Sequence, residues 1–462
     1  MIDTDCRTDT PAVLLEHNVH DDFAQARALK TAWDDLAARC SDLFCSYDWC
    51  EAWWQHYGHG RRLQIHVFRH ADRMVGVLPL FVERFGLSAA GLRVIRLLGS
   101  DHTLDAAGLA LLPEYADACM TCLLDTLANQ RAWDILQLGP LRGYMKVAEQ
   151  IERACARHPD VQVVLIGRHD NWLSHYEIPE TYEAYLQTLS GNQRRDSLRR
   201  QRKLSEAHRV EVRTVHDPAE VPAAMDDLVQ LHQALWRGKG QRGQFVDWPG
   251  YEAFHRDVAQ RLARAGRLAL VRFEVDGQVV AVSYGGHFGS RTHTMIRGQC
   301  DEQRWTECSL GRLLNLHMIR NAIERGSNAV DDGRGVFAYK LRLGARLQGE
   351  RSVTALRRGR GRRLRFWAAM RMAYLVHLAY GRIWFDTLAP RLGVDRPLRA
   401  FYIRSQFLAQ LFRRVRFRLF GGPKVVHARC LTWVPPESLA DPADRTVVSD
   451  LKPAGNTGAA DE

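Results

Sequence analysis

The chain has 462 residues, of which 46% are hydrophobic and 25% are charged. This composition is typical of a globular protein and argues against a collagen-like or low-complexity chain. The length exceeds what one hydrophobic core usually organises, so two or three domains are expected. The formal net charge of +11 is unevenly distributed: residues 356–424 hold 17 Lys and Arg against two Asp, a net charge of +15, which leaves −4 for the rest. The charge therefore does not indicate a general nucleic-acid-binding protein.

The N-terminus is acidic and has no apolar run, which predicts a chain without a secretory signal. No stretch reaches 18 uncharged apolar residues, so no transmembrane helix is expected. Cys119 and Cys122 form a C-x-x-C pattern, but they fall inside an expected helix without a second Cys or His pair at zinc spacing. The sequence predicts a cytoplasmic protein with reduced core thiols and no metal site, with the inner face of the cell membrane as an alternative location.

A first domain is expected over residues 1–168. It starts with a strand at 12–17, a helix at 21–39 and a tryptophan-rich helix that follows Phe44, and its indoles either stack on a ligand or pack against a sheet. Alternating residues predict a hairpin from 63–68 and 74–82, in which Pro79 indicates an edge strand or a bulge. Further elements are expected as strands at 92–98 and 135–138, and as helices at 115–129 and 144–157.

A second domain is expected over residues 169–355. Its helices are predicted at 181–189, 192–208, 221–236 and 251–265, with a strand at 210–215. The helix at 192–208 is rich in arginine, which indicates either a solvated face or an anion-binding surface. Strands follow at 267–275, 278–287 and 292–297. Asp276-Gly277 between the first two is a strong hairpin signal, because an Asp-Gly pair suits a two-residue turn.

The two expected domains share an order of elements: helices, then hairpin strands, then a helix and a strand. Each also has a short polar hairpin turn, at Asp72-Arg73 and at Asp276-Gly277, followed by an apolar strand. The sequence therefore predicts a structural duplication.

The pattern changes after residue 355. Residues 356–430 mix aromatic and aliphatic side chains with many arginines, which predicts basic amphipathic helices. One interpretation is peripheral association with an anionic membrane through residues 356–424. The other is a helical appendage packed on the core with its arginines outward. Residues 431–462, rich in Pro, Ala, Asp and Gly, are expected to form a disordered tail.

Two features between His293 and Arg342 suggest chemistry. Ser309-Leu310-Gly311-Arg312 is a small-residue start to an expected helix, where backbone N–H groups can face a phosphate. Asp331-Asp332-Gly333-Arg334-Gly335 follows the next expected strand, where an α/β unit commonly places its site. The alternative for this second stretch is a polar turn closed by an Asx-type hydrogen bond.

The order of motifs from Asp276 to Lys340 resembles that of GNAT-type N-acyltransferases. The shared features are the Asp-Gly hairpin with its apolar strand, the Ser-x-Gly-x-x-Leu helix start and the Tyr339-Lys340 pair. The branch it resembles is CelD-like, associated with cellulose and exopolysaccharide operons and related to the FemAB peptidyltransferases. Phe44, Ser46 and Trp49, with the strand ending in Leu-Pro-Leu, agree with that branch. The resemblance implies an α/β (α+β) fold of tandem GNAT-like acyltransferase domains with mixed central sheets, plus a basic helical C-terminal appendage.

The resemblance also implies a donor, acetyl-CoA or another acyl-CoA, with its pyrophosphate on the N-terminus of the helix after the fourth strand. A helix N-terminus favours such an anion because its first N–H groups are unpaired and it has a partial positive charge. The matching positions are Cys308, Ser309, Leu310, Gly311, Arg312 and Leu313.

The family's acyl-transfer cleft contains an aromatic-Lys pair, which Tyr339-Lys340 matches. By that resemblance Lys340 is expected to stabilise the oxyanion and Tyr339 to return a proton to the departing thiolate. Asp331 and Asp332 are the nearest candidates for a base that deprotonates an attacking amine. The candidate substrate-binding residues are Trp53, Arg195, Arg199 and Arg334.

The expected function is acyl transfer from acyl-CoA to an amine of a sugar, peptide, or envelope or exopolysaccharide precursor. Direct attack without an acyl-enzyme is expected, because no nucleophile elbow is present. One alternative is a FemAB-like aminoacyl or peptidyl transferase. Another is a non-catalytic GNAT-fold partner of a membrane polysaccharide synthase. No specific nucleic acid is expected, except tRNA under the FemAB-like alternative.

Overall fold

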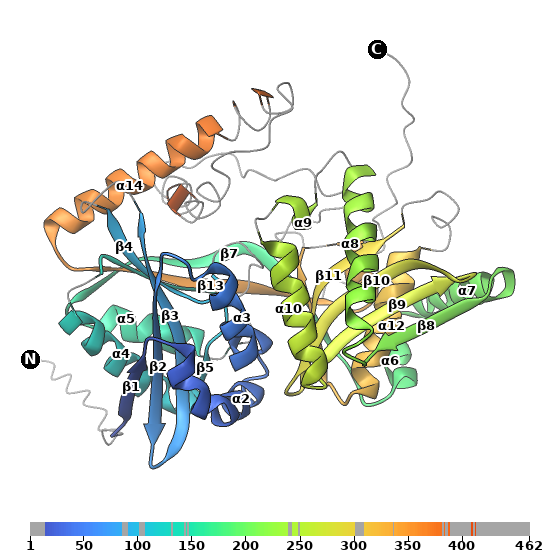
Figure 1. Ribbon diagram of the computed structural model, residues 1–462, viewed down its shortest axis with the longest axis horizontal. Helices are drawn as coiled ribbons and strands as arrows, with labels where there is room; N and C mark the ends of the chain where they lie inside the picture. The colour runs from blue at the N-terminus through green and yellow to red at the C-terminus, as the bar shows by residue number, and fades with distance from the viewer. Residues whose placement is uncertain are drawn as a thin grey trace, which may run out of the picture. The chain divides into compact units, whose positions relative to one another are not determined.

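The computed structural model describes residues 14–380, with gaps at 86–90, 101–106, 131–132, 143–144, 146, 239–242, 248–249, 301–308 and 336, and also residues 383, 387–388, 408–409 and 412. The expected tail at 431–462 and most of the region 381–430 lie outside these described residues. The chain forms two compact units, each of which contains a run of both antiparallel and parallel strand pairs (Figure 1). Unit 1 comprises Met1–Arg168 and Arg351–Arg416, and unit 2 is centred on His169–Glu350.

Unit 1 has a six-stranded sheet in the order β1-β2-β3-β4-β6-β13, with the two-residue strand β5 paired to β3. The strands are β1 (Glu16–His20), β2 (Arg62–His70), β3 (Arg73–Phe85), β4 (Leu92–Leu97), β5 (Ala110–Leu111), β6 (Ile135–Leu141) and β13 (Arg346–Arg357). The α-helices are α1 (Phe23–Ala26), α2 (Lys30–Arg39), α3 (Tyr47–Tyr57), α4 (Ala116–Gln130), α5 (Ala148–Arg157) and α14 (Arg360–Ala379). Neighbouring strands of the main path are antiparallel except β4 and β6, which are parallel.

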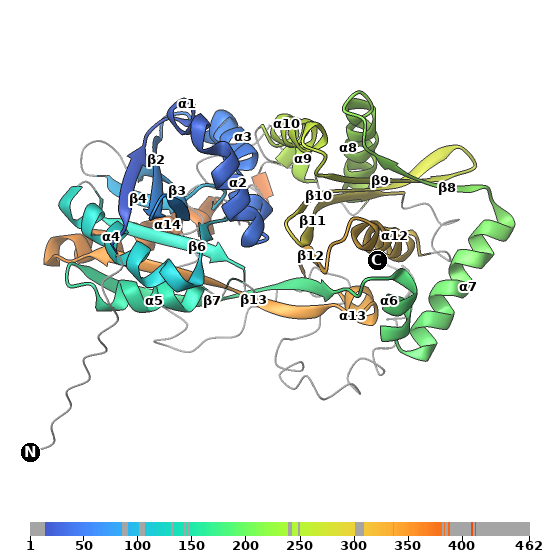
Figure 2. The same cartoon turned by 90° about the horizontal axis from the view of Figure 1, so that it is seen from below.

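Unit 2 has a sheet in the order β8-β9-β10-β11-β12-β7. Its strands are β7 (Val161–Glu177), β8 (Val210–Val215), β9 (Leu268–Val275), β10 (Gln278–Phe288), β11 (Arg291–Gln299) and β12 (Ala329–Arg334). Its helices are α6 (Tyr182–Thr188), α7 (Gly191–Ala207), α8 (Val221–Gly238), α9 (Gln244–Asp247), α10 (Tyr251–Arg264), α12 (Leu310–Glu324) and α13 (Ala338–Arg342). Helices α8 and α10 cover one face of this sheet and α12 covers the other (Figure 2).

The duplication predicted from the sequence is confirmed by the strand pairings. In both units a run of four antiparallel strands is followed by a parallel pair joined through a helix, β4-α4-β6 in unit 1 and β11-α12-β12 in unit 2. In each case the sixth strand is antiparallel to the last parallel strand. The sixth strands are exchanged along the chain: β7 follows α5 of unit 1 and pairs with β12, whereas β13 follows α13 of unit 2 and pairs with β6.

The hairpin predicted at Asp276-Gly277 is confirmed. Asp276 and Gly277 have φ of 53° and 78°, and β9 pairs with β10 directly across them. A two-residue turn of type I′ requires positive φ at both central positions, which Gly and Asp tolerate better than branched residues. This turn therefore sets the register in which β9 and β10 begin to pair, with Val275 opposite Gln278.

The edge position predicted for Pro79 is wrong, because β3 lies between β2 and β4. Pro79 pairs with Ile65 of β2. On its other side β5 pairs with Gly76 and Val77, and β4 begins its ladder at Leu80. Pro79 thus occupies the break between two partner strands, where the missing N–H interrupts neither ladder.

The core of unit 2 is built on α12. Its buried side chains include Leu313, Leu314 and Ile319, which pack with residues of β9, β10 and β12. Burial of one such aliphatic side chain contributes about 1.5–3 kcal/mol relative to exposure. This packing anchors α12 against the sheet and so determines where its N-terminus lies relative to the end of β11.

The C-x-x-C cysteines lie in α4, as expected, and both are free thiols. Cys119 is buried, and burial raises the pKa of its thiol to about 12. A thiol that remains protonated is a poor nucleophile and metal ligand. The described residues contain no group of three or more His, Cys, Asp or Glu that could hold a metal ion. Among the same residues, no helix is both long and apolar enough to cross a membrane.

Candidate functional site

The parallel strands β11 and β12 separate towards their carboxyl ends. Their described ladder has three pairs, from Arg291 with Ala329 to His293 with Asp331, although β11 continues to Gln299 and β12 to Arg334. A bulge in β11 coincides with the end of this ladder, because Met295 is the extra residue between two consecutive pairs with β10. Bulges commonly bend a strand next to a functional site. The carboxyl ends of separating parallel strands are also where α/β sheets bind ligands.

The N-terminus of α12 lies beside the end of β11. Ser309 precedes the helix in a left-handed conformation, with φ of 54°, and its side chain does not cap the helix. The amides of Arg312 and Leu313 donate to Ser309 O, so those of Leu310 and Gly311 precede the first backbone bonds of the helix. A Cβ at Gly311 would lie 2.6 Å from Oε1 of Gln299, which ends β11. Cys308, the first residue of the predicted phosphate-binding stretch, lies outside the described residues.

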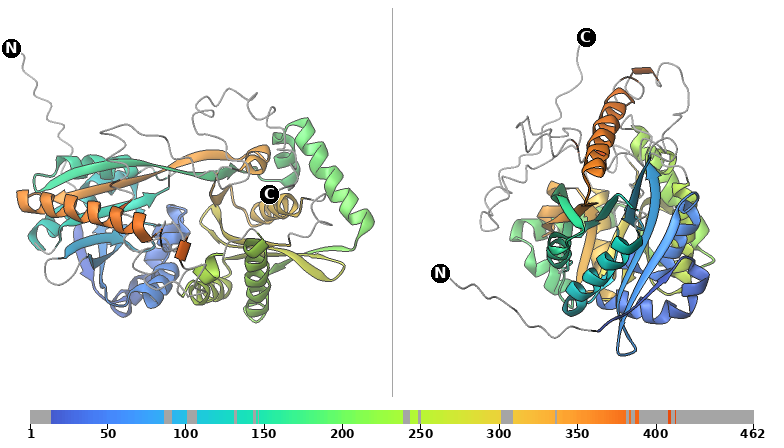
Figure 3. Two further views of the ribbon diagram at one scale, coloured as in Figure 1. Left: turned by 90° about the horizontal axis from the view of Figure 1, so that it is seen from above. Right: turned by 90° about the vertical axis from the view of Figure 1, so that its left-hand side faces the viewer.

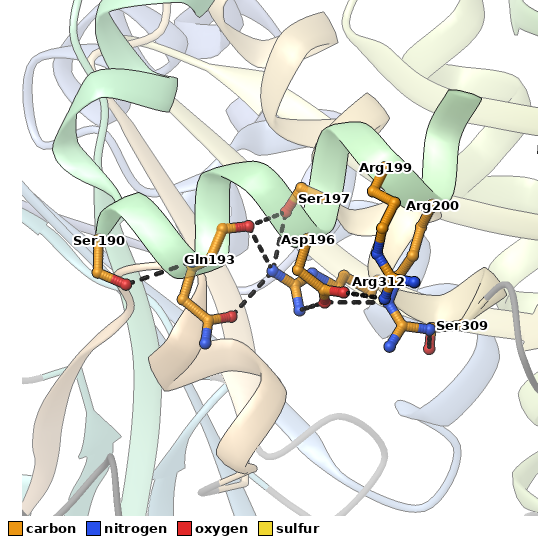
Figure 4. A network of polar contacts seen from close by, with 8 residues as sticks. All are labelled: Ser190, Gln193, Asp196, Ser197, Arg199, Arg200, Ser309 and Arg312. Atoms are coloured by element: carbon orange, nitrogen blue, oxygen red, sulfur yellow. Dashed lines mark hydrogen bonds and ion pairs between the residues drawn. The ribbon is translucent and has the colours of Figure 1, made fainter. Parts of the chain in front are cut away.

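Arg312 does not face a ligand at this helix start but joins α12 to α7 (Figure 4). Its Nη2 donates to Gln193 O and Oε1 at 2.9 Å and to Ser197 Oγ at 2.8 Å. Its Nη1 donates to Asp196 Oδ2 at 3.0 Å. The side chain of Arg312 is 10% exposed. Arg312 therefore fixes the position of α7 against the first turn of α12.

An arginine of α7, Arg200, also reaches the start of α12. Arg200 Nη1 donates to Ser309 Oγ at 2.9 Å, while its Nε donates to Asp196 (Figure 4). Asp196 also accepts from Arg199 and Arg312, and these three arginines lower the pKa of its carboxyl against the opposing effect of burial. Three cations around one carboxylate leave an excess of positive charge next to the N-terminus of α12, which adds to the helix dipole.

Arg195 and Arg199, two predicted substrate-binding residues, lie on the exposed side of α7. Arg195 bonds within its own helix, to Gly191 O and Asn192 Oδ1. The side chain of Arg199 is 63% exposed and pairs with Asp196 one turn earlier. Arg195 and Arg199 are therefore solvated, whereas Arg200 of the same helix reaches the start of α12.

The side chain of Asp332 is fully buried between two cations. It forms an ion pair with Arg297 of β11, and its Oδ2 lies 3.4 Å from Nζ of Lys340. Lys340 is 3% exposed, and its Nζ also donates to the main-chain oxygen of Asp332 at 2.8 Å. Burial lowers the pKa of Lys340 against the opposing effect of Asp332. The Arg297-Asp332-Lys340 cluster joins β11, β12 and α13 where the β11–β12 ladder has ended.

Tyr339 and Lys340 point in different directions. Tyr339 is partly exposed and lies close enough to Arg297 for that cation to affect its pKa, whereas the Lys340 ammonium lies inside among protein oxygens. Burial raises the pKa of Tyr339, and Asp332 raises it further, although Arg297 opposes both. Tyr339 therefore stays protonated near neutral pH. Because an arginine side chain can only donate, Arg297 leaves the phenolic proton available to another acceptor.

The two aspartates expected as bases are buried. Asp331 is 2% exposed, and its Oδ1 accepts from the amide of Gly333 at 3.0 Å, which is the Asx-type turn that the sequence left as an alternative. Asp332 is held by Arg297 and Lys340. These contacts favour a structural role for both carboxylates over proton abstraction from an acceptor amine.

The remaining predicted substrate residues are engaged elsewhere. Arg334 forms a bidentate pair with the fully buried side chain of Glu350, at 3.1 Å for Nε–Oε1 and 2.6 Å for Nη2–Oε2. Trp53 is fully buried in unit 1, with its ring 5.1 Å from that of Phe81 and the Arg61 guanidinium 5.3 Å away. Trp53 thus packs in a core, the second of the two uses considered for the tryptophans.

The sequence did not single out Arg297, Asp196 or Arg200 as site residues. Arg297 had one weak local signal, a cation that directly follows the apolar pair Met295-Ile296 in a predicted strand. Arg200 and Asp196 are two of many charges on a basic helix. Nothing in their spacing distinguishes them from the charges that stay exposed to solvent. Only the packing of α7 on α12 separates them from their neighbours.

One residue of the cluster differs between the two ladders. Counted from the first parallel pair of each ladder, Asp332 of β12 corresponds to Leu138 of β6. Among the aligned strand positions that the structure describes, the acidic centre of the Arg297-Asp332-Lys340 cluster is therefore particular to unit 2.

Comparisons with known proteins place a family match on unit 2. Residues 191–341 match the family model described as an acetyltransferase (GNAT) domain. No curated protein matches the chain. Among solved structures, the crystal structure of FemX is similar at a TM-score of 0.53 and 11% identity, over 73% of this chain and 96% of that chain.

Two further solved structures have lower scores. A conserved protein of unknown function from Bacteroides thetaiotaomicron gives a TM-score of 0.46 at 10% identity, over 74% of this chain and 100% of its own. The C-terminal domain of a putative lysylphosphatidylglycerol synthetase from Agrobacterium fabrum gives 0.43 at 12% identity, over 74% and 95%. The family match shows that unit 2 contains a GNAT-type acetyltransferase domain, and the likeness to FemX supports the α/β fold with its mixed sheets.

Proposed function

We propose that unit 2 transfers an acyl group from acyl-CoA to an amine. The observation that supports this most is the separation of β11 and β12 beyond the end of their ladder, near which lie the N-terminus of α12 and the Tyr339–Arg297 pair. The first feature suits a phosphate and the second suits a leaving group that needs a proton. The match of residues 191–341 to an acetyltransferase domain agrees with both.

The N-terminus of α12 fits the pyrophosphate of a CoA donor. The amides of Leu310 and Gly311 are available by their place in the helix, because the first backbone bonds of α12 begin at Arg312. Arg200 adds a cation at Ser309. These residues would bind and orient the donor, so that its thioester enters the opening between the strands.

The transfer proceeds by direct attack of the acceptor nitrogen on the thioester carbonyl. The new C–N bond forms, the C–S bond breaks, the nitrogen loses one proton to solvent and the sulfur departs as a thiolate. Tyr339 donates its phenolic proton to that thiolate, because its raised pKa keeps it protonated and Arg297 leaves its O–H free to donate. An amide of the bulged segment at Met295 is a candidate donor to the carbonyl oxygen.

Lys340 is a positioning residue in this scheme. It was expected to stabilise the oxyanion, but its ammonium donates to the Asp332 main-chain oxygen and lies near Asp332 Oδ2. Through Asp332 it holds Arg297, and Arg297 orients Tyr339. The acceptor we propose is an amine of a sugar, peptide, or envelope or exopolysaccharide precursor, following the CelD-like resemblance.

Calorimetric titration with acetyl-CoA tests the donor assignment. Saturable binding is expected for the wild type and should be lost in Gly311→Glu, which adds a negative charge and a clash with Gln299 at the helix start. Gly361→Glu is a matched control, because Gly361 is also the second residue of a helix and a Cβ there meets nothing within 4 Å. No binding by the wild type at about millimolar ligand, a free energy near −4 kcal/mol, would reject a CoA donor.

A second candidate is FemAB-like transfer from aminoacyl-tRNA, which the exposed arginines of α7 favour. Arg199 and Arg202 have side chains 63% and 73% exposed on one helix that borders the α12 start. A polyanionic donor would use such a row, with affinity that falls steeply with salt. Tight tRNA binding that Arg195→Glu with Arg199→Glu abolishes, together with no acetyl-CoA binding, would favour this candidate over the first.

A further inference from the structure

Helix α14 has two apolar faces, and unit 1 covers one of them. Phe366, Met370 and Ala373 are buried against residues of β4, β6 and β13. Figure 3 shows the helix lying along the unit 1 sheet, in agreement with its contact with β4. Arg362 and Arg365 attach the start of the helix to the buried Asp134, at 3.4 and 3.1 Å. The helix is therefore held in a defined orientation.

The opposite face of α14 exposes large apolar side chains. Leu364, Met372 and Leu375 are 72%, 62% and 48% exposed, and Ala368 and Ala379 lie between them on the same stripe. At about 100° per residue, these five positions fall within an arc of roughly 80°, nearly opposite the buried residues. We call them the outer stripe of α14. A contiguous exposed stripe of this kind indicates an interaction surface, unlike scattered single residues.

Arginines border the outer stripe. At about 100° per residue, Arg365 and Arg371 lie next to its two edges; both are exposed, and α14 contains no Asp or Glu. The larger segment 356–424 has a net charge of +15. An apolar stripe whose charged neighbours on the helix are all cations matches the boundary between headgroups and acyl chains of an anionic bilayer. A protein partner would need an acidic groove around an apolar floor, whereas anionic lipid supplies both features in one surface.

We propose that α14 binds the surface of an anionic membrane through its outer stripe. The helix lies in the interface with Leu364, Met372 and Leu375 directed to the acyl chains, while the opposite face stays on unit 1. Arg371, beside the stripe, meets lipid phosphates. This inference does not depend on the acyl-transfer proposal, because no residue of α14 belongs to the candidate site.

Co-sedimentation of the full-length protein with vesicles tests the inference. Binding is expected to phosphatidylglycerol-containing vesicles at about 150 mM salt and to be much weaker to pure phosphatidylcholine. Leu364→Glu with Met372→Glu should lower the partition coefficient by about 100-fold or more, because it removes apolar burial and adds repulsion. Leu198→Glu with Val246→Glu is the matched control, since these residues are 47% and 61% exposed in unit 2, and it should leave binding unchanged. Circular dichroism verifies that each variant is folded.

Three results would overturn the inference. The wild type fails to sediment with anionic vesicles, or the α14 variant binds as well as the wild type, or the control variant loses binding equally. Light scattering tests the other possible occupant of the stripe, a second copy of the chain. The outer stripe would be assigned to self-association if the wild type forms a dimer but does not bind vesicles, and if the α14 substitutions dissociate that dimer.

Discussion

Lys340→Met tests the positioning role assigned to this lysine. The substitution keeps most of the aliphatic stem but removes the ammonium that joins α13 to β12. Because Lys340 is 3% exposed, water does not replace the lost contacts. Lys340→Met should therefore lower the free energy of unfolding and leave Tyr339 less firmly positioned.

The size of the effect follows from two contacts. A buried hydrogen bond from a charged donor contributes about 1.5–3 kcal/mol, and the Nζ to Asp332 O distance is 2.8 Å. Breaking an isolated buried ion pair costs about 3–5 kcal/mol, but Asp332 keeps Arg297 as a partner, so only part of that cost applies. Lys340→Met should therefore lower the free energy of unfolding by about 2–4 kcal/mol.

Urea unfolding at neutral pH measures this change. Lys203→Met is the control, since it removes the same charge from the exposed side of α7 and should shift stability by no more than about 0.5 kcal/mol. A double-mutant cycle with Asp332→Asn should give a coupling energy between Lys340 and residue 332 of at least about 1 kcal/mol. In the Asp332→Asn background, loss of Lys340 no longer leaves a buried carboxylate without one of its cations. A Lys340→Met change below about 0.5 kcal/mol, or a coupling near zero, would refute the buried cluster as a stabilising element.

Three further outcomes are expected. Tyr339→Phe should lower kcat for acyl transfer by about 100-fold, the lower range of general acid catalysis, without changing the acetyl-CoA Kd; equal kcat values would exclude Tyr339 as the acid. Arg312→Met removes the bonds to Gln193, Asp196 and Ser197, so the amides of α7 should exchange faster, and unchanged exchange would contradict the docking of α7 by this residue. Burial lowers the pKa of His287 to about 4, so the unfolded state binds its proton first and stability falls as the pH drops from about 6.5 towards 4. Comparison of urea midpoints should show that His287→Gln reduces the wild-type loss between pH 7 and 5 by about 2 kcal/mol, and an identical pH dependence would contradict this assignment.

Local patterns predicted the parts of the fold that depend on neighbouring residues. Asp276-Gly277 predicts its hairpin because both positions need positive φ, a property of the residues themselves. The duplication was also visible in the order of elements. The exchange of β7 and β13 was not, because each pairs with a strand far away in the chain and its apolar pattern suits either sheet.

In the candidate site, too, contacts between residues far apart in the chain were not predicted from the sequence. The sequence placed Tyr339 and Lys340 together as a functional pair, yet successive residues at a helix start point about 100° apart, so one faces Arg297 and the other faces inward. Arg297 was missed because its partner Asp332 lies across a parallel ladder that α12 connects. The helix start at Ser309-Leu313 was found from its residue types, whereas the inward use of Arg312 depends on α7, which packs there from another part of the chain.

Amide exchange with and without acetyl-CoA tests the central claim most directly, because it reports where the donor binds. With acetyl-CoA bound, exchange should be slower in β11 from Thr294 to Gln299 and in the first turn of α12 at Leu310 and Gly311, with no comparable change in the parallel pair of unit 1. Protection confined to other segments, or none at saturating ligand, would contradict an acyl donor in the opening between β11 and β12.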